Sequence, residues 1–242
     1  MKYIVVIPAR FKSTRFPGKP LIDLAGKTMI QRVYEQCTKV IPSELIYVAT
    51  EDKRIQDHCH DLGIQCLLTS EDCLTGTDRV AEVAASIDAD YYVNLQGDEP
   101  LFDPGDIASI IEAIEKKSGP IYNGYCSILS EQEHKSTSVP KVVFRNDGRL
   151  LYMSRAAIPG NKANSFHFAY RQVCIYAFPK SALKAFANQK EKTRFEKEED
   201  IEILRFLEMG YEVEMIEMSS KSIPIDKPED VDSVLLKLRN ES

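Results

Sequence analysis

Three cations and two hydroxyls follow the first strongly apolar run of the chain. The run 4–7 predicts a buried strand, and the loop after it carries Arg10, Ser13, Thr14, Arg15 and Lys19. Ligands of an open α/β sheet bind at the carboxyl ends of its strands, and cations spaced along such a loop suit a polyphosphate. A solvated surface loop is the alternative. Pro17, Gly18 and Pro20 stiffen the segment, which favours a binding loop.

Two aspartates are candidates for holding a metal ion. Asp98 follows the apolar run 91–95 and stands between Gly97 and Pro100, so it lies at the same edge of the predicted sheet. Carboxylates suit Mg²⁺, which binds through one or two of them together with substrate phosphates. A strand-ending turn explains this pattern equally well. Asp226 could supply a second carboxylate, although a position just before the last helix also suits a capping residue.

Two arginines occupy positions that need a partner, which is anionic or polar for Arg79 and anionic for Arg155. Arg79 falls in the first turn of a helix that Thr77 or Asp78 would cap, where a cation opposes the helix dipole. A base or a phosphate could be its partner. Arg155 interrupts the apolar stretch 151–159, and a buried arginine needs a paired anion. That anion is either a substrate carboxylate or one of the 37 acidic residues of the chain.

Alternating strand and helix patterns in the first half predict a mostly parallel sheet covered by helices. The predicted strands are 4–7, 45–49, 66–68 and 91–95, and the predicted helices are 29–40, 54–62, 78–87 and 107–117. In the second half, shorter runs predict further strands at 139–144, 150–154, 172–178 and 212–216, some of them antiparallel. We expect helices at 191–209 and 229–239 and exposed loops at 127–138 and 160–170.

The composition is that of an ordinary globular protein. The 242 residues are 43% hydrophobic and 28% charged, and no linker divides them, so 1–242 is predicted to be a single domain. The net charge of −6 argues against a nucleic-acid partner. We expect no membrane association, since no apolar run approaches spanning length and no signal peptide is present. Six scattered cysteines without a Cys-x-x-Cys pair predict reduced thiols in a cytoplasmic protein.

Together these segments resemble the CMP-sugar synthetases, most closely the 3-deoxy-D-manno-octulosonate (Kdo) cytidylyltransferases. The matching blocks run in family order over nearly the whole chain: PARFKSTRFPGKPL (8–21), GKTMIQRVYE (26–35), VATEDKRI (48–55), TGTDRVAEV (75–83), NLQGDEP (94–100), YMSRAAIP (152–159) and IDKPEDV (225–231). The resemblance implies a Rossmann-like sheet and a homodimer, with 127–170 as the candidate dimerisation or flap subregion. It also implies transfer of the cytidylyl group of CTP to a sugar acid, with Mg²⁺ as cofactor, for lipopolysaccharide or capsule synthesis.

The resemblance implies a role for each matched residue. Lys19, Asp98 and Asp226 are expected to be catalytic, with Asp98 and Asp226 as the Mg²⁺ ligands. CTP is expected to contact Ala9, Arg10, Ser13, Arg15, Lys19, Thr75, Asp78 and Arg79. The sugar acid is expected to contact Gln96, Arg155, Gln172, Tyr176, Glu199 and Glu202.

Several positions depart from the family pattern in the sugar pocket. Gln172 replaces a usual histidine, Ile203 replaces a usual glutamine, and Lys227 stands in a segment that usually reads Gly-Val-Asp-Thr-Pro. A site built to bond particular hydroxyls rejects analogues that lack them. These changes therefore favour a related ulosonic acid, such as an 8-amino-Kdo, over Kdo itself.

Two other functions compete with this interpretation. One is a nucleotidyltransferase for a sialic-acid-like acid or another sugar, and the other is a nucleotide-binding module without catalysis. A dinucleotide-dependent oxidoreductase is excluded, because Pro8 to Phe11 stand where a Gly-x-Gly-x-x-Gly motif would follow the first strand.

Overall fold

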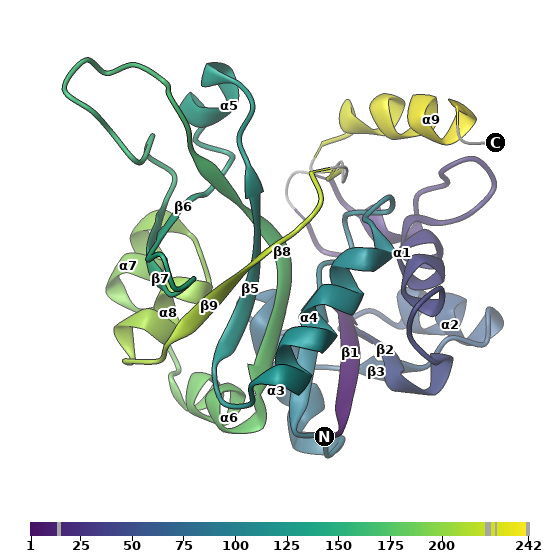
Figure 1. The fold of residues 1–242 in the computed structure, drawn as a ribbon. Coiled ribbons are helices and arrows are strands. Elements are labelled where there is room, and N and C mark those ends of the chain that lie inside the picture. The colour runs from purple at the N-terminus through teal and green to yellow at the C-terminus, as the bar shows by residue number, and fades with distance from the viewer. Residues whose placement is uncertain (14–15, 221–223, 226, 241–242) are drawn as a thin grey trace.

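The computed structural model describes residues 1–13, 16–220, 224–225 and 227–240. A nine-stranded sheet forms its centre (Figure 1). The strands are β1 (Tyr3–Pro8), β2 (Ile46–Thr50), β3 (Cys66–Leu68), β4 (Tyr91–Leu95), β5 (Ile121–Ser127), β6 (Lys141–Phe144), β7 (Leu150–Ser154), β8 (Tyr170–Pro179) and β9 (Val213–Glu217). Seven of them follow the order β3-β2-β1-β4-β8-β5-β9, while β6 pairs with β7 and with β8.

The sheet is parallel in its first half and mixed in its second. β1 pairs in parallel with β2 and β4, and β2 pairs in parallel with β3. β8 is antiparallel to both β4 and β5, whereas β9 is parallel to β5. The chain thus builds outward from β1 to β3 and then returns to place β4 on the other side of β1. The predicted α/β fold, with a mostly parallel first half and antiparallel strands in the second, is confirmed.

Helices cover both faces of the sheet, which is why the apolar run of β1 is buried on both sides. Val5 and Ile7 face α1 (Met29–Thr38), α2 (Lys53–Asp61) and α4 (Pro104–Lys116). Ile4 and Val6 face α3 (Gly76–Ser86), α6 (Lys180–Asn188) and α8 (Ile203–Glu208). The side-chain alternation of a strand produces these two cores from four consecutive residues.

The remaining helices lie away from the sheet centre. The short helices α5 (Glu131–Lys135) and α7 (Arg194–Glu199) lie on the β5–β9 side, and η1 (Lys19–Leu21) and η2 (Ser43–Leu45) are single turns. α9 (Asp230–Asn240) lies on the α1 side (Figure 1), where Val234 packs in a small core with Leu24 and Met29. No helix in the described ranges is long and apolar enough to cross a membrane.

The structure corrects several predicted elements. The predicted helix 191–209 is wrong: Asp200 adopts a left-handed conformation with φ 51° and separates α7 from α8. The predicted loop 127–138 contains α5, and β5 and α6 had no predicted counterpart. β5 has no clear sequence pattern because Asn123 and Gly124 interrupt it. Gly124 is needed there, since a Cβ atom would lie 2.8 Å from side-chain atoms of Ile175 and Met218.

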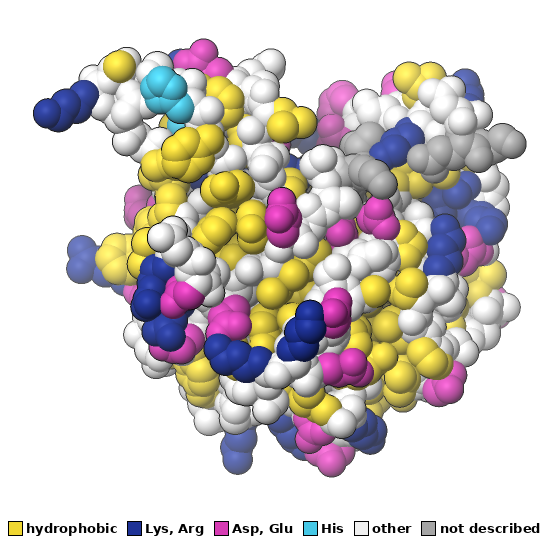
Figure 2. Space-filling model, viewed as in Figure 1, with side chains coloured by type: hydrophobic (Ala, Val, Ile, Leu, Met, Phe, Trp, Pro, Cys, Tyr) yellow, Lys and Arg dark blue, Asp and Glu magenta, His cyan; other side chains and the backbone are white. Residues whose placement is uncertain are grey.

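Exposed apolar side chains lie on adjacent segments near the start of β8. Figure 2 shows hydrophobic side chains on both halves of this face of the molecule, including the half that contains β5 to β9. Leu129 and Phe168 are 78% and 62% exposed, and the backbone hydrogen bond from Ile128 to Ala169 brings their segments side by side. The rings of Phe144, Tyr125 and Phe168 all pack against Tyr170. We call Tyr125, Leu129, Phe144, Phe168 and Tyr170 the aromatic patch.

Candidate active site

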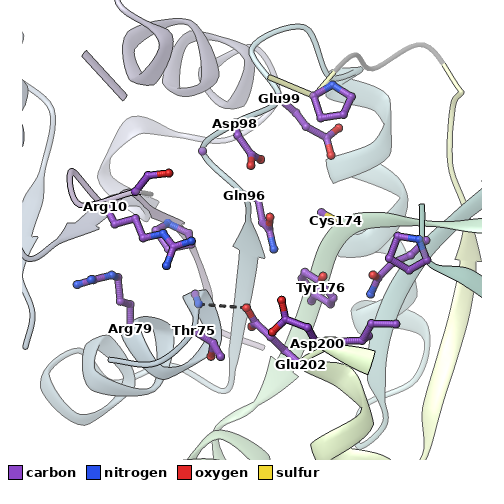
Figure 3. Close-up of a pocket in the computed structure, with 18 of the residues that line it drawn as sticks. Arg10, Thr75, Arg79, Gln96, Asp98, Glu99, Cys174, Tyr176, Asp200 and Glu202 are labelled. Carbon is purple, nitrogen blue, oxygen red and sulfur yellow. Dashed lines mark hydrogen bonds between the residues drawn. The ribbon is translucent and has the colours of Figure 1, made fainter. Parts of the chain in front are cut away.

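A cavity of about 520 Å³ opens at the carboxyl ends of β1 and β4 (Figure 3). From β1 the chain adds β2 and β3 on one side and then places β4 on the other side, so the strand order reverses between β1 and β4. Ligands of open α/β sheets usually bind at such a switch point. The lining comes from the loop after β1, the start of α3, the end of β4, one face of β8 and the α7–α8 junction. Segments more than 100 residues apart therefore contribute to one site.

The loop after β1 presents polar side chains to this cavity. Ala9 is buried, and its amide donates to the carbonyl of Ala49 at 2.9 Å, which extends the pairing of β1 and β2. Arg10 and Ser13 line the cavity, and the Ser13 hydroxyl accepts a hydrogen bond from the amide of Phe16. Arg10 is exposed and, within the described part of the chain, makes no close ion pair, although its charge helps to lower the pKa of Asp200 on the opposite wall. Arg15 lies outside the described residues.

Lys19 and Asp98 form the polar centre of the site. The Nζ atom of Lys19 lies 3.0 Å from Oδ2 of Asp98 and donates to the carbonyl of Ile225 at 2.7 Å. The amide of Ile225 in turn donates to the carbonyl of Asp98 at 2.9 Å. These bonds join the loop after β1, the end of β4 and the segment that precedes α9. Asp226 itself lies outside the described residues.

The start of α3 forms a second wall. Thr75, and not Thr77 or Asp78, caps this helix, because Asp78 at the third helical position completes a capping box with Thr75. Asp78 accepts from the amide and hydroxyl of Thr75 and pairs with Arg205, so its carboxylate serves the helix terminus and does not line the cavity. Glu202 accepts from the amides of Gly76 and Thr77 and from the Thr77 hydroxyl. Burial raises the pKa of Glu202, although these hydrogen bonds oppose the shift.

Arg79 has a partner inside the protein. Its Nη2 atom lies 2.7 Å from Oε2 of Glu51, and both side chains are about as buried as core residues, at 5% and 4% exposed. Its Nη1 atom donates to the Thr69 hydroxyl and the Ser70 carbonyl. The predicted partner of Arg79 is a base or a phosphate, whereas the structure pairs it with Glu51, which is not among the predicted site residues. The sequence feature that could have identified Glu51 is its position directly after β2, at the carboxyl edge of the sheet.

Arg155 is held by backbone carbonyls and not by an internal carboxylate. Its guanidinium donates to the carbonyls of Glu199, Thr137 and Asp200 at 2.5, 3.0 and 3.0 Å. These neutral partners orient the group beside the cavity, and its charge helps to lower the pKa of the nearby Glu199 and Asp200 carboxyls. Glu199 does not line the cavity: its carboxylate accepts from the Ser154 hydroxyl and the Arg155 amide. Burial opposes ionisation of Glu199, but these hydrogen bonds outweigh it and lower its pKa.

One face of β8 forms the floor of the cavity. Gln172, Cys174 and Tyr176 alternate along the strand and all point to this side, while the amide of Gln96 donates to the Cys174 carbonyl. Gln172 is 7% exposed and its Nε2 atom donates to Oδ1 of Asn123 at 3.0 Å. Burial raises the pKa of the Tyr176 hydroxyl well above its ordinary value, so the floor is uncharged at neutral pH. Asn123 is a second buried polar partner that the sequence analysis missed.

Most of the residues singled out in the sequence surround this cavity. Those that line it are Ala9, Arg10, Ser13, Lys19, Thr75, Arg79, Gln96, Asp98, Arg155, Gln172, Tyr176 and Glu202. Asp78 and Glu199 support the walls from behind, and Arg15 and Asp226 lie outside the described residues. The contact of each residue with CTP, metal or sugar acid stays a prediction. The arrangement offers cations for a phosphate chain beside a carboxylate and a neutral, hydrogen-bonding floor.

Comparisons with known proteins give one consistent family. A family model described as cytidylyltransferase matches residues 4–221. The 3-deoxy-manno-octulosonate cytidylyltransferase of Protochlamydia amoebophila is 38% identical over 239 residues, which cover 96% of this chain and 92% of that protein. The 8-amino-3,8-dideoxy-manno-octulosonate cytidylyltransferase of Shewanella frigidimarina is also 38% identical, over 98% of this chain and 99% of its own. A solved CMP:2-keto-3-deoxy-manno-octonic acid synthetase complexed with CTP has a TM-score of 0.92 and 32% identity, with full coverage of both chains.

Proposed function

Because this chain belongs to the cytidylyltransferase family, we propose that it transfers the cytidylyl group of CTP to Kdo or a close relative of Kdo. The family, the fold and the enzyme class predicted from the sequence are confirmed. The products of the proposed reaction are a CMP-sugar acid and pyrophosphate. The pairing of Lys19 with Asp98 in the cavity at the β1–β4 switch point is the observation that carries this proposal.

The proposed reaction is an in-line displacement at the α-phosphorus of CTP. The anomeric hydroxyl of the sugar acid loses its proton to solvent as its oxygen forms the new bond to phosphorus, and the bond between the α-phosphorus and the oxygen that bridges to the β-phosphate breaks, so pyrophosphate leaves with that oxygen. Negative charge accumulates on phosphate oxygens in this step, and fixed cations stabilise it. Arg10 and Lys19 supply such charges, and the walls align the two substrates. No histidine lines the cavity within the described ranges, so the structure does not support a histidine as the base that deprotonates the attacking hydroxyl.

A divalent metal fits the site, and we propose Mg²⁺. Nucleotidyltransferases of this family generally use a divalent metal. No group of three metal-ligating side chains occurs among the described residues, but Mg²⁺ needs only one or two carboxylates when phosphates complete its shell. Asp98 is the proposed ligand in the cavity. Asp226 is the proposed second ligand because the amide of its neighbour Ile225 donates a hydrogen bond to the carbonyl of Asp98. When bound, the metal would neutralise the α-phosphate and acidify the attacking hydroxyl.

The sugar acid is proposed to lie on the β8 floor. Arg155 is the candidate partner of its carboxylate, because it lines the cavity and backbone carbonyls, with no carboxylate of the described residues, accept the hydrogen bonds of its guanidinium. Gln172 and Tyr176 are candidate partners of its hydroxyls or of an amino group. The Kdo and 8-amino-Kdo relatives are equally similar to this chain at 38%, so similarity alone does not choose between the two acids. We also propose that the protein is a homodimer, with the aromatic patch in its interface.

The decisive experiment substitutes Asp98 with asparagine and follows pyrophosphate release from CTP, Mg²⁺ and Kdo or 8-amino-Kdo. The variant keeps the shape of the side chain but loses the charge that the metal and Lys19 require. We expect turnover to fall by at least 10²–10³-fold, a loss on the order of that seen when one transition-state contact is removed. Removal of divalent cations with a chelator is expected to abolish the activity of the unchanged protein.

Asp57→Asn is the matched control. Asp57 makes the same kind of lysine pair as Asp98, but on the exposed surface of α2. It should have normal activity. A near-normal rate for Asp98→Asn would contradict the metal assignment. Absence of CTP-dependent pyrophosphate release from the unchanged protein with every ulosonic acid would contradict the proposed function.

A further inference from the structure

Glu51 connects two walls of the cavity without lining it. It follows β2 directly, and its side chain is 4% exposed. We propose that Glu51 is a positioning residue for CTP, one that sets the loop after β1 and the Arg79 guanidinium relative to each other. This inference rests on the proposed function, because CTP is the ligand that both walls would bind.

The first contact of Glu51 is with the back of the loop. Its Oε1 atom accepts from the amide of Phe11 at 2.9 Å and from the amide of Lys12 at 3.4 Å. Phe11 and Lys12 do not line the cavity, whereas Arg10 and Ser13 on either side of them do. Glu51 thus holds Phe11 and Lys12 from behind and leaves their neighbours Arg10 and Ser13 facing the cavity.

The loop is closed on itself around Phe11. The amide of Gly18 donates to the Phe11 carbonyl at 2.9 Å, and Gly18 has a left-handed φ of 71°. A Cβ atom at position 18 would lie 3.1 Å from the Phe11 ring, so glycine permits this close approach. The guanidinium of Arg54 covers the ring at 3.4 Å from its centre. A shift of Phe11 would therefore move Gly18, which directly precedes Lys19.

The second contact of Glu51 is its ion pair with Arg79. Oε2 lies 2.7 Å from Nη2, while Nη1 of the same guanidinium is fixed by Thr69 and Ser70. Arg79 lines the cavity, so Glu51 determines where this edge of the guanidinium stands. One buried carboxylate thus uses one oxygen for each wall.

Oε1 of Glu51 accepts hydrogen bonds from two amides, while Oε2 lies against the Arg79 guanidinium in an ion pair without hydrogen-bond geometry, which makes the effect of substitution specific. A glutamine at this position must turn its NH₂ group either toward the loop amides or toward Arg79, and both are donors. An aspartate keeps the charge but is one methylene shorter, so it cannot hold both walls at their present separation. The two variants disturb the same geometry by different means.

The test compares Glu51→Gln and Glu51→Asp with the unchanged protein. Affinity for CTP with Mg²⁺ is measured by calorimetry without sugar acid, and KM is measured separately for CTP and for the sugar acid. We expect the Kd and KM for CTP to rise about tenfold or more in Glu51→Gln, because small displacements of positioning groups are costly. The rise should be smaller in Glu51→Asp, and KM for the sugar acid should stay within about twofold.

Glu71→Gln is the control, because Glu71 pairs with Lys12 of the same loop at the exposed surface. It should bind CTP normally. Unchanged CTP affinity in both Glu51 variants would overturn the proposal, as would an equal loss for both substrates or loss of the folded state in both variants. Failure of the unchanged protein to bind CTP would instead contradict the proposed function.

Discussion

At Gln172, hydrogen bonding decides which atom of the side chain is available to a ligand. The amide nitrogen of Asn123 donates to the carbonyls of Val173 and Ile175, which can only accept. The Asn123 oxygen must therefore face Gln172, and Gln172 must donate to it through Nε2. The oxygen of Gln172 has no protein partner within the described part of the chain. It is therefore free to act as an acceptor, which would suit a hydroxyl or an ammonium group of a ligand in the cavity.

We predict that Gln172→Leu lowers kcat/KM for the sugar acid while leaving KM for CTP unchanged. The variant removes the acceptor and leaves the Asn123 oxygen buried without a donor. The loss of one such bond corresponds to roughly 10-fold to 100-fold in kcat/KM. Steady-state kinetics with Kdo and with 8-amino-Kdo measure it.

A histidine at this position provides the control. Gln172→His can donate to Asn123 through one ring nitrogen and keep the other as an acceptor, so it should retain most of the activity. If the leucine and histidine variants had the same kcat/KM as the unchanged protein, Gln172 would have no role in binding the sugar acid.

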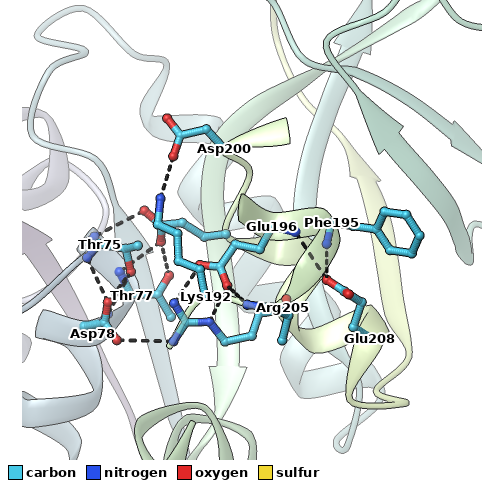
Figure 4. Close-up of polar contacts among 12 residues, drawn as sticks. Thr75, Thr77, Asp78, Lys192, Phe195, Glu196, Asp200, Arg205 and Glu208 are labelled. Carbon is cyan, nitrogen blue, oxygen red and sulfur yellow. Dashed lines mark hydrogen bonds and ion pairs between the residues drawn. The ribbon is translucent and has the colours of Figure 1, made fainter. Parts of the chain in front are cut away.

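At the scale of elements, a buried ionic network joins α7 and α8 to the start of α3 (Figure 4). Arg205 of α8 makes two bonds of 2.6 Å to Glu196 of α7, and neither side chain is exposed. The guanidinium also lies 3.4 Å from Oδ1 of Asp78 in α3 and 3.7 Å from the centre of the Phe186 ring. With the Glu202 contacts to the α3 amides, this network fixes the position of the wall that carries Thr75 and Arg79.

We predict that Arg205→Met destabilises the protein by about 3–5 kcal/mol, because it leaves the Glu196 carboxylate buried without its partner. The double variant Glu196→Gln/Arg205→Met removes the stranded charge and should recover part of the loss. Urea unfolding monitored by circular dichroism gives both free energies. A single variant as stable as the unchanged protein would show that the pair contributes no net stability.

This network also explains why the sequence predicted the wrong element here. Residues 191–209 are rich in charged residues at helical spacing, which is typical of one solvated helix. The structure instead buries Glu196 and Arg205 against each other, and the left-handed conformation of Asp200 between them interrupts the helix. The break lets Glu202 reach α3. Charge pattern alone does not distinguish a buried ion pair from two exposed charges, so the two short helices could not be predicted.

At the scale of the whole molecule, the sequence predicted which residues lie around the cavity better than it predicted the contacts among them. The apolar runs of β1 and β4 identified two neighbouring strands, and the polar residues after each run meet at one edge of the sheet. The hydrogen bond from Lys19 to the carbonyl of Ile225 joins residues 206 positions apart, because both lie at that edge of the sheet. Glu51, directly after β2, and Asn123, within β5, were missed because a single polar residue in or beside a strand carries no sign that it will be buried and paired.

The last prediction concerns assembly. The aromatic patch includes Phe168, which is 62% exposed, and Leu129, which is 78% exposed, on adjacent segments. Large exposed apolar side chains gathered on one surface are typical of protein interfaces. Tyrosine and phenylalanine are also enriched in such interfaces. We therefore expect the unchanged protein to be a dimer and Phe168→Asp to be a monomer, because the variant places an unpaired charge in the interface.

Light scattering after size-exclusion chromatography measures both masses, and Leu236→Asp on α9 is the matched control. Leu236 is also 62% exposed, but α9 lies on the opposite side of the molecule (Figure 1). This variant should remain dimeric. A monomeric unchanged protein would contradict the prediction of a homodimer. A dimer that persists in Phe168→Asp and dissociates in Leu236→Asp would instead place the interface on the α9 side, away from the aromatic patch.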